Sequence, residues 1–493
     1  MTKQGIRSRF ITLPPSRFLA WALVGALAAL LALLPLSSLA LLFPLVLALL
    51  LAPLGPIAGL ALAILSVPVQ DVWRLPGGLS YTQAAMLLAA TAWGLDRLAG
   101  ARRPSRTGRL LIPWLGFLWA LLLAAALSPF SVADGIKETM RWAEAFAIWW
   151  IATDTARHPR DIAVLVGCLL LAPLAEAIIG LAQFASGDGP PSFRIAAGLP
   201  YVRAYGTIGQ PNSFAGYLNM AWPLALALAA GITWRAWRRR TMPQAILAAG
   251  LWLVAALLLA ALLASFSRGA WLGAALGLLG LALALGGRAR LAALAALALA
   301  ALALALGGAG LLPAAVAARL ASITAYLAPF DAGSVALTPA NFAIVERMSQ
   351  IQAGWRMFIA HPLSGVGPGN FSNAYPAFAV GSWYVSRGHA HNYYMHIAAE
   401  AGAVGWAAYM LLLLALARQA LRTLRSVKAI IPRSITVGCC GIIAAVVGHD
   451  IFENLHVLSM GIQLAAVWAL LGILEQFEQR PQIVIENQQK SGV

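Results

Sequence analysis

Apolar runs long enough to cross a lipid bilayer recur along almost the whole chain. A transmembrane helix needs about 20 predominantly apolar residues. Of the 493 residues, 61% are hydrophobic and only 10% are charged, which leaves too little polar surface to cover water-soluble domains. The sequence therefore predicts an all-α polytopic membrane protein.

The apolar runs give about 14 candidate spans. Those at 37–53 and 55–68 are short and interrupted by prolines, so we expect 12 to 14 transmembrane helices. The candidate spans are 18–36, 37–53, 55–68, 83–99, 110–127, 138–153, 162–184, 213–232, 243–265, 270–286, 291–312, 396–417, 434–450 and 457–475.

The basic residues predict the orientation of these spans. With a cytoplasmic N-terminus, 24 of the 34 Lys and Arg residues fall in alternate connections on the cytoplasmic side, as the positive-inside rule requires. The net charge of +17 therefore reflects membrane topology, and we expect no nucleic-acid partner. Cys168, Cys439 and Cys440 lie in apolar stretches without metal-ligand spacing, so we expect buried thiols and no disulfide framework.

One connection is much longer than the others. Residues 313–395 are expected on the outer, extracytoplasmic side, and a loop of this length in a compact protein is usually functional. We expect three parts: an N-terminal transmembrane bundle at 1–312, a large periplasmic loop at 313–395, and C-terminal transmembrane helices with a short cytoplasmic tail at 396–493.

Ten basic residues remain outside or within the membrane, and two of them stand in distinctive contexts. Arg268 lies in Ser-Phe-Ser-Arg-Gly between two apolar spans. It either snorkels to lipid headgroups or binds an anion at the mouth of a cavity. Arg203 precedes the loop Gly206-Thr-Ile-Gly-Gln-Pro-Asn212, which is either an ordinary capping turn or a set of amide donors for an anion at a helix N-terminus.

Histidines cluster where the long loop re-enters the membrane. His389-Ala-His391-Asn392 lies at this point, and a second group at 449–456 contains two more histidines and two carboxylates. A metal site built from both groups is one interpretation. A neutral histidine that acts as general base beside an arginine-bound anion needs no metal, and because arginine prefers phosphate, a lipid diphosphate is a natural ligand.

These residues resemble the Wzy-C superfamily of O-antigen ligases, O-antigen polymerases and bacterial O-oligosaccharyltransferases. The family signature is His followed by Asn, Ser or Gln, then nine residues and Gly-x-x-Gly. Here His391-Asn392 is followed by nine residues and by Gly402-Ala-Val-Gly405. Further matches lie at 206–212, 267–269, 361–371 and 449–456.

The resemblance implies an inverting, metal-independent glycosyltransferase of GT-C architecture that needs no cofactor. The enzyme would sit in the cell inner membrane and move a glycan from undecaprenyl diphosphate to lipid A-core, a growing glycan or a protein on the periplasmic face. His391 would be the catalytic base, and Arg203 and Arg268 would bind the diphosphate. The supporting residues would be His389, Asn392, Gln210, Asn212, Glu400, Arg347 and His456.

Two interpretations of other classes stay open at this stage. A small-anion transporter, such as a bicarbonate carrier, would show inverted repeats and charges at the bilayer midplane, whereas the candidate residues here lie at the outer ends of spans. A structural scaffold would leave Arg268 and His391 unexplained.

Overall fold

The computed structural model describes residues 48–70, 72, 80–100, 106, 108–195, 201–308, 330–338 and 341–491. Within these residues the chain is helical, with two isolated β-bridges and no strand. The prediction of an all-α polytopic membrane protein is confirmed. The expected span at 18–36 and residues 37–47 of the one at 37–53 lie outside the described residues.

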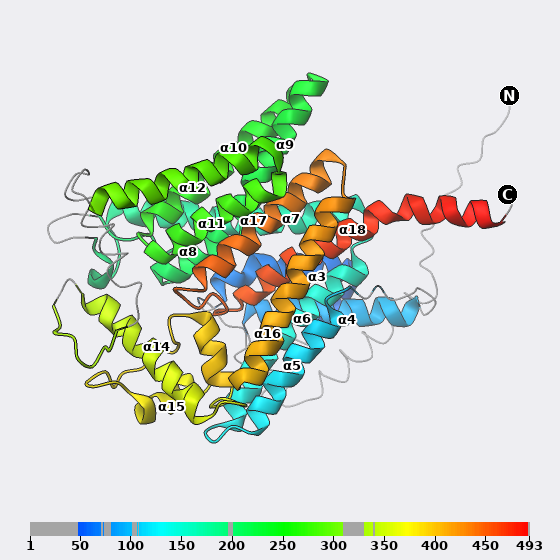
Figure 1. The fold of residues 1–493 in the computed structure, drawn as a ribbon. Helices are drawn as coiled ribbons and strands as arrows, with labels where there is room; N and C mark the ends of the chain where they lie inside the picture. Colours follow the sequence, from blue (N-terminus) through cyan, green and yellow to red (C-terminus); the bar gives the residue numbers. More distant parts are fainter. Residues whose placement is uncertain are drawn as a thin grey trace, which may run out of the picture.

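Figure 1 shows the helices of the described residues gathered in one bundle. In chain order they are η1 Ala52–Leu54, α3 Pro56–Ser66, η2 Val67–Val69, α4 Tyr81–Ala99, α5 Leu111–Ala126, α6 Val132–Thr155, α7 Pro159–Ser186, η3 Pro191–Phe193, α8 Pro211–Asn219, α9 Trp222–Arg239, α10 Met242–Ala264, α11 Arg268–Leu285, α12 Gly287–Gly308, α14 Phe342–Ala360, α15 Phe371–Phe378, α16 Tyr393–Ser426, α17 Ile430–His449 and α18 Met460–Ser491.

Seven helical segments of the described chain are long and apolar enough to cross a membrane, and eight if one strongly bent pair counts as a span. The seven are α7, α8 with α9, α10, α11, α16, α17 and the first part of α18. Among the other expected spans, α5 has only 16 residues, and α6 carries charged side chains such as Lys137 and Glu144. The expected total of 12 to 14 spans therefore stays a prediction.

Two of the spans are interrupted. The helical run of α8 and α9 is broken at Met220 and Ala221, and Pro223 follows in the first turn of α9, where its missing N–H costs nothing. Gly402 interrupts α16 with φ +63° and ψ −166°, a conformation that residues with a Cβ rarely adopt. The turn after α14 packs against this kink, and Ala403 N donates a hydrogen bond of 2.8 Å to Pro362 O. A Cβ at position 402 would collide with the backbone of Leu363.

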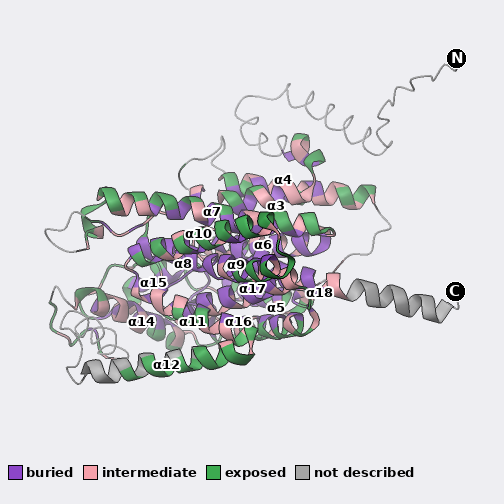
Figure 2. Cartoon of the chain, turned by 90° about the horizontal axis from the view of Figure 1, so that it is seen from above, coloured by how far each residue is buried: buried purple, intermediate pink, exposed green. Residues whose placement is uncertain are grey.

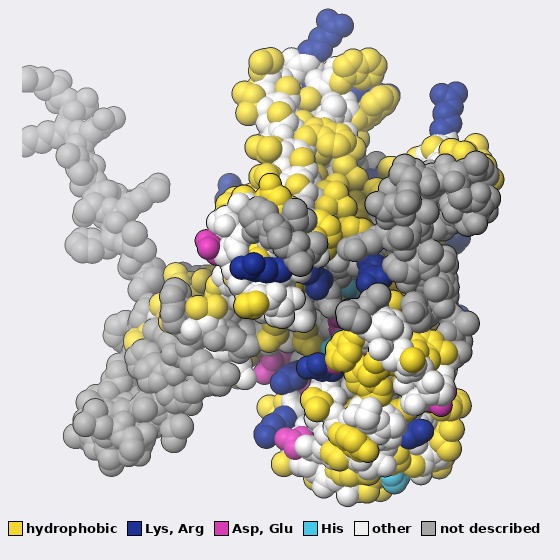
Figure 3. All heavy atoms as spheres, turned by 90° about the vertical axis from the view of Figure 1, so that its left-hand side faces the viewer, with side chains coloured by type: hydrophobic (Ala, Val, Ile, Leu, Met, Phe, Trp, Pro, Cys, Tyr) yellow, Lys and Arg dark blue, Asp and Glu magenta, His cyan; other side chains and the backbone are white. Residues whose placement is uncertain are grey.

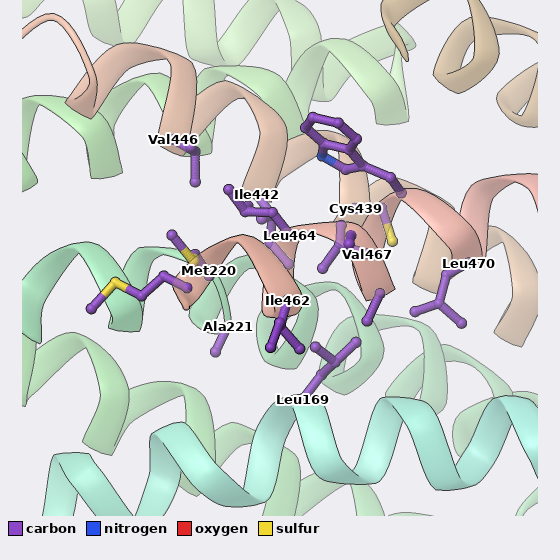
Figure 4. Packing of buried hydrophobic residues seen from close by; sticks show 14 of the residues in the cluster. Leu169, Met220, Ala221, Cys439, Ile442, Val446, Ile462, Leu464, Val467 and Leu470 are labelled. Carbon is purple, nitrogen blue, oxygen red and sulfur yellow. The ribbon is translucent and has the colours of Figure 1, made fainter. Parts of the chain in front are cut away.

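Buried side chains concentrate in the middle of the bundle, whereas the peripheral helices expose apolar ones (Figure 2). One buried hydrophobic cluster forms the core, and it includes Leu169 of α7, Met220 after α8, Ile442 of α17 and Leu464 of α18 (Figure 4). All three cysteines are free, and Cys439 is part of this core. At the periphery α12 exposes leucines such as Leu291, as expected for a surface covered by lipid.

Candidate active site

A cavity of about 480 Å³ lies where five segments of the chain meet. Helices α8, α11 and α14, the approach to α16 and the turn after α17 all contribute to its wall. Figure 3 looks at this end of the molecule, where basic side chains stand among apolar ones. The charged and polar side chains of the lining are Arg203, Asn212, Ser267, Arg268, Arg347, His391 and Asn392. The structure thus brings both predicted diphosphate-binding arginines and the predicted base to one cavity.

A buried carboxylate beside this cavity connects its polar groups. Glu453 is only 4% exposed, and its Oε1 lies 3.1 Å from His389 Nε2 and 3.2 Å from His391 Nδ1. Its Oε2 accepts a hydrogen bond of 3.0 Å from Asn212 Nδ2 and lies 3.9 Å from the guanidinium of Arg347. Because a buried carboxylate needs such partners, Glu453 fixes all four groups relative to one another.

The hydrogen bonds also assign the protons of the two imidazoles. The backbone N–H of His391 donates to His389 Nδ1 at 3.1 Å, so the proton of His389 lies on Nε2 and points to Glu453. Burial lowers the pKa of His389 to about 3 against the opposing charge of Glu453, and the ring is therefore neutral near pH 7. His391 donates from Nδ1 to the same carboxylate, which leaves the lone pair on its Nε2.

The charge state of Glu453 follows from competing effects. Burial alone would raise the pKa of this carboxyl group, but the hydrogen bond from His391 and the neighbouring His389 and Arg347 outweigh burial and hold the pKa well below its usual value. Glu453 is therefore ionised over the physiological pH range and can stabilise a positive charge on His391.

His391 itself has a constrained backbone. Its φ is +51°, in the left-handed region that few residues other than glycine and asparagine adopt. The next residue, Asn392, caps α16 by accepting from Met395 N at 2.9 Å and donates to Ile451 O at 3.1 Å. The turn before α16 is thereby fastened to the turn after α17, which is where Glu453 lies.

The two arginines that are predicted to bind the diphosphate are positioned in different ways. Arg203 donates from Nε to Ser265 O at 2.7 Å and from Nη2 to Asn212 Oδ1 at 2.8 Å, so its guanidinium is oriented before any ligand binds. Arg268 is the first residue of α11, whose N-cap Ser267 makes no side-chain capping hydrogen bond. The positive end of the helix macrodipole therefore adds to the arginine charge at the cavity.

The Ser-Arg-Gly motif ends in Gly269, a position that has no room for a side chain. A Cβ at this position would lie 2.9 Å from Phe452 Cβ and 3.3 Å from His449 Cδ2, closer than side chains normally approach. The absence of a side chain lets the start of α11 come against the turn after α17. The motif therefore has a packing reason in addition to the charge of Arg268.

Besides His389, which contacts Glu453, three of the expected supporting residues lie outside the cavity lining. Gln210 is exposed and caps α8, where its side chain accepts from Asn212 N at 3.0 Å. Glu400 is buried and accepts backbone hydrogen bonds from Gly369 and Phe371 at 2.8 and 2.9 Å. His456 stacks on Tyr393 with ring centroids 4.2 Å apart. These three residues support the loops and helices around the cavity rather than its wall.

The side chains of His389, His391 and Glu453 are also of the types that ligate divalent metal ions. Their ligand atoms lie within 4.8 Å of one another, close enough for a zinc-like coordination. The same carboxylate pairs with Arg347, however, and two further arginines line the adjacent cavity. This excess of positive charge disfavours a dication and favours an anion.

The described chain is a helical multi-pass membrane protein in which arginines and an oriented histidine line one cavity. Residues 253–410 match the family model Wzy-C, described as O-antigen ligase. The match confirms the resemblance to the Wzy-C superfamily and indicates a glycosyltransferase-like enzyme of the O-antigen ligase or polymerase type. The matched region includes Arg268, Arg347 and His391, whereas Arg203 and Glu453 lie outside it. No curated protein matches the chain.

Proposed function

We propose that the protein is an O-antigen ligase-like glycosyltransferase. It transfers a glycan from undecaprenyl diphosphate to an acceptor on the periplasmic face of the inner membrane, with inversion at the anomeric carbon and without a metal ion. The observation that carries the proposal is the pairing of an oriented imidazole, His391 on Glu453, with arginines that line the same cavity.

The chemistry assigns one role to each group. His391 Nε2 takes the proton of the acceptor hydroxyl while the acceptor oxygen attacks the anomeric carbon from the side opposite the diphosphate. The bond between that carbon and the diphosphate oxygen breaks, and the diphosphate leaves with the electron pair. Arg203 and Arg268 stabilise the negative charge that develops on it, and Glu453 stabilises the imidazolium.

The apolar part of the cavity suits the lipid portion of such a donor. Leu272 of α11, Ile344 and Met348 of α14, and Phe452 after α17 line it beside the arginines. A polyprenyl chain needs an apolar surface next to its charged head, because transfer of each CH₂ from water is favourable by about 0.8 kcal/mol. The lining offers both surfaces within one cavity.

The long loop has a defined part in this proposal. Helix α14, within residues 313–395, contributes Arg347 and the apolar side chains around it to the cavity wall. We therefore assign the loop as a wall of the active site between the two transmembrane parts, 1–312 and 396–493. The N-terminus would then be cytoplasmic and the site extracytoplasmic, as the basic connections predict.

Three acceptors are candidates for this transfer: lipid A-core, a growing glycan and a protein. All three offer a nucleophile that His391 can deprotonate, so they share the chemistry above. A single experiment tests both the class and the acceptor: purified protein is supplied with a polyprenyl-diphosphate-linked glycan and each acceptor separately, and product is measured for the wild type and for His391→Asn. Asparagine suits the left-handed backbone at this position, which protects the fold.

We expect transfer to one acceptor by the wild type and none by His391→Asn. His361→Asn is the matched control, because His361 follows α14 and lies outside the cavity lining; it should retain activity. Full activity of His391→Asn would end the general-base assignment. Absence of transfer to every acceptor would favour the transporter interpretation, which anion uptake into liposomes then tests.

A further inference from the structure

A second large cavity lies at the opposite end of two helices that form the active site. This groove has a volume of about 610 Å³ and is lined by α9, the end of α11 and the start of α17. Helix α11 begins at Arg268 in the active-site cavity and reaches the groove with Leu278 and Leu285, whereas α17 begins in the groove at Ile430 and ends at His449 beside the active-site cavity. The three helices lie next to one another in the bundle (Figure 1).

The walls of the groove are apolar. Four leucines and three alanines of α9 and α11 form half of the lining, and Ile430 and Val437 of α17 add to it. Gly231 of α9 contacts Ser434 of α17 so closely that a Cβ would collide with the hydroxyl, and the two helices are held together at this point. An apolar surface at this position, on helices that span the membrane, suits hydrocarbon chains.

The mouth of the groove is cationic and aromatic. Lys428 is exposed, and the half-buried Arg433 donates from Nη1 to Leu424 O at 2.9 Å, which fixes its guanidinium at the start of α17. Trp234 is 48% exposed, and the guanidinium of Arg238 lies 4.8 Å from its ring centroid. No Asp or Glu is among the described residues that line the groove. Positive charge and an interfacial tryptophan thus meet at the edge of an apolar surface.

We propose that the groove binds a membrane phospholipid with a net negative headgroup. Its acyl chains lie along α9, α11 and α17, and its phosphate binds Lys428 and Arg433. A zwitterionic phospholipid offers the same chains but carries its own cation, so it competes poorly for these two side chains. The bound lipid bridges α9, α11 and α17, and it therefore stabilises α11, which carries Arg268 at its other end, and α17, which leads into the turn that carries Glu453.

Binding is tested without any measurement of glycan transfer. Purified full-length protein in detergent is titrated with phosphatidylglycerol or with phosphatidylcholine, and the shift in thermal unfolding temperature and the lipid retained in native mass spectra are recorded. We expect tighter binding of phosphatidylglycerol. Because a basic side chain near anionic lipid contributes about 1 kcal/mol, Lys428→Gln should weaken that binding about fivefold, and Lys428→Gln with Arg433→Gln about 25-fold.

Two further variants separate the parts of the proposal. Arg422→Gln removes an exposed charge near the C-terminal end of α16, a few residues before Lys428 but outside the groove lining. This variant should leave the preference for phosphatidylglycerol unchanged. Ala230→Phe fills the apolar wall with both charges intact and should weaken binding of either lipid. Equal binding of the two lipids by the wild type, or an undiminished preference in Lys428→Gln, would overturn the proposal.

Discussion

Replacement of Glu453 by glutamine removes one charge from the active site and almost no volume. Glu453 accepts the hydrogen bond from His391 Nδ1 at 3.2 Å and is only 4% exposed. When His391 takes the acceptor proton, that bond becomes one between two charged groups. Such bonds contribute about 1.5 to 3 kcal/mol, and each 1.36 kcal/mol changes a rate tenfold. We therefore expect Glu453→Gln to lower kcat by about 10- to 150-fold.

The assay is transfer from a polyprenyl-diphosphate-linked glycan under saturating substrate, with thermal unfolding as a check on folding. Glu346→Gln is the matched control, because Glu346 pairs with Arg387 outside the cavity lining; it should act like the wild type. If Glu453 works through His391, the double variant His391→Asn/Glu453→Gln is no slower than His391→Asn alone. Wild-type turnover by a folded Glu453→Gln protein would refute this reasoning.

Three further predictions concern the anion site, the metal and the fold. Arg268→Lys should lower kcat/KM at least tenfold in the same transfer assay, because an ammonium cannot bind two phosphate oxygens as a planar guanidinium does; unchanged turnover would mean that Arg268 serves only the lipid interface. Prolonged chelation followed by metal analysis should leave transfer unchanged, and loss of activity that zinc restores would make the His389–His391–Glu453 cluster a metal centre. Gly402→Ala should lower the free energy of unfolding by more than about 1 kcal/mol, seen as a lower unfolding temperature. Gly250→Ala, a helix position with open space around it, should not lower it, and equal stability of the two variants would contradict the steric argument.

The sequence predicts the cavity's basic side chains well because their chemistry is local. An arginine at the end of an apolar run is expensive wherever the chain folds, so Arg203 and Arg268 stand out without any knowledge of tertiary contacts. The same holds for the His-x-His-Asn segment at the start of a span. The structure places Arg203, Arg268, His391 and Asn392 in the lining of one cavity.

The partners of those residues could not be predicted in the same way. Glu453 belongs to a turn that the sequence analysis treats as part of a candidate metal cluster and of a match to the family, without a role for Glu453 itself, although it is the carboxylate that joins His391 to Asn212. That pairing links positions 241 residues apart, which no local pattern encodes. Conversely, the resemblance implies a supporting role for Glu400, and its carboxylate accepts the backbone N–H groups of Gly369 and Phe371 outside the cavity lining. The sequence feature that could have identified Glu453 is its acidic side chain in the connection between two apolar runs, at their outer ends.

The hydrogen bond between Asn212 and Glu453 has a consequence for biogenesis. It joins the early and late segments of a site whose charged groups are synthesised in the order Arg203, Arg268, Arg347, Glu453, with about half the chain between the first and the last. The guanidinium groups therefore enter the translocon before the carboxylate that balances them exists. Under the proposed function, a nascent chain that stalls ahead of the turn after α17 would carry the arginines without the carboxylate that orients His391. We therefore expect incomplete insertion products to be inactive, and glycan transfer to arise only at the end of assembly.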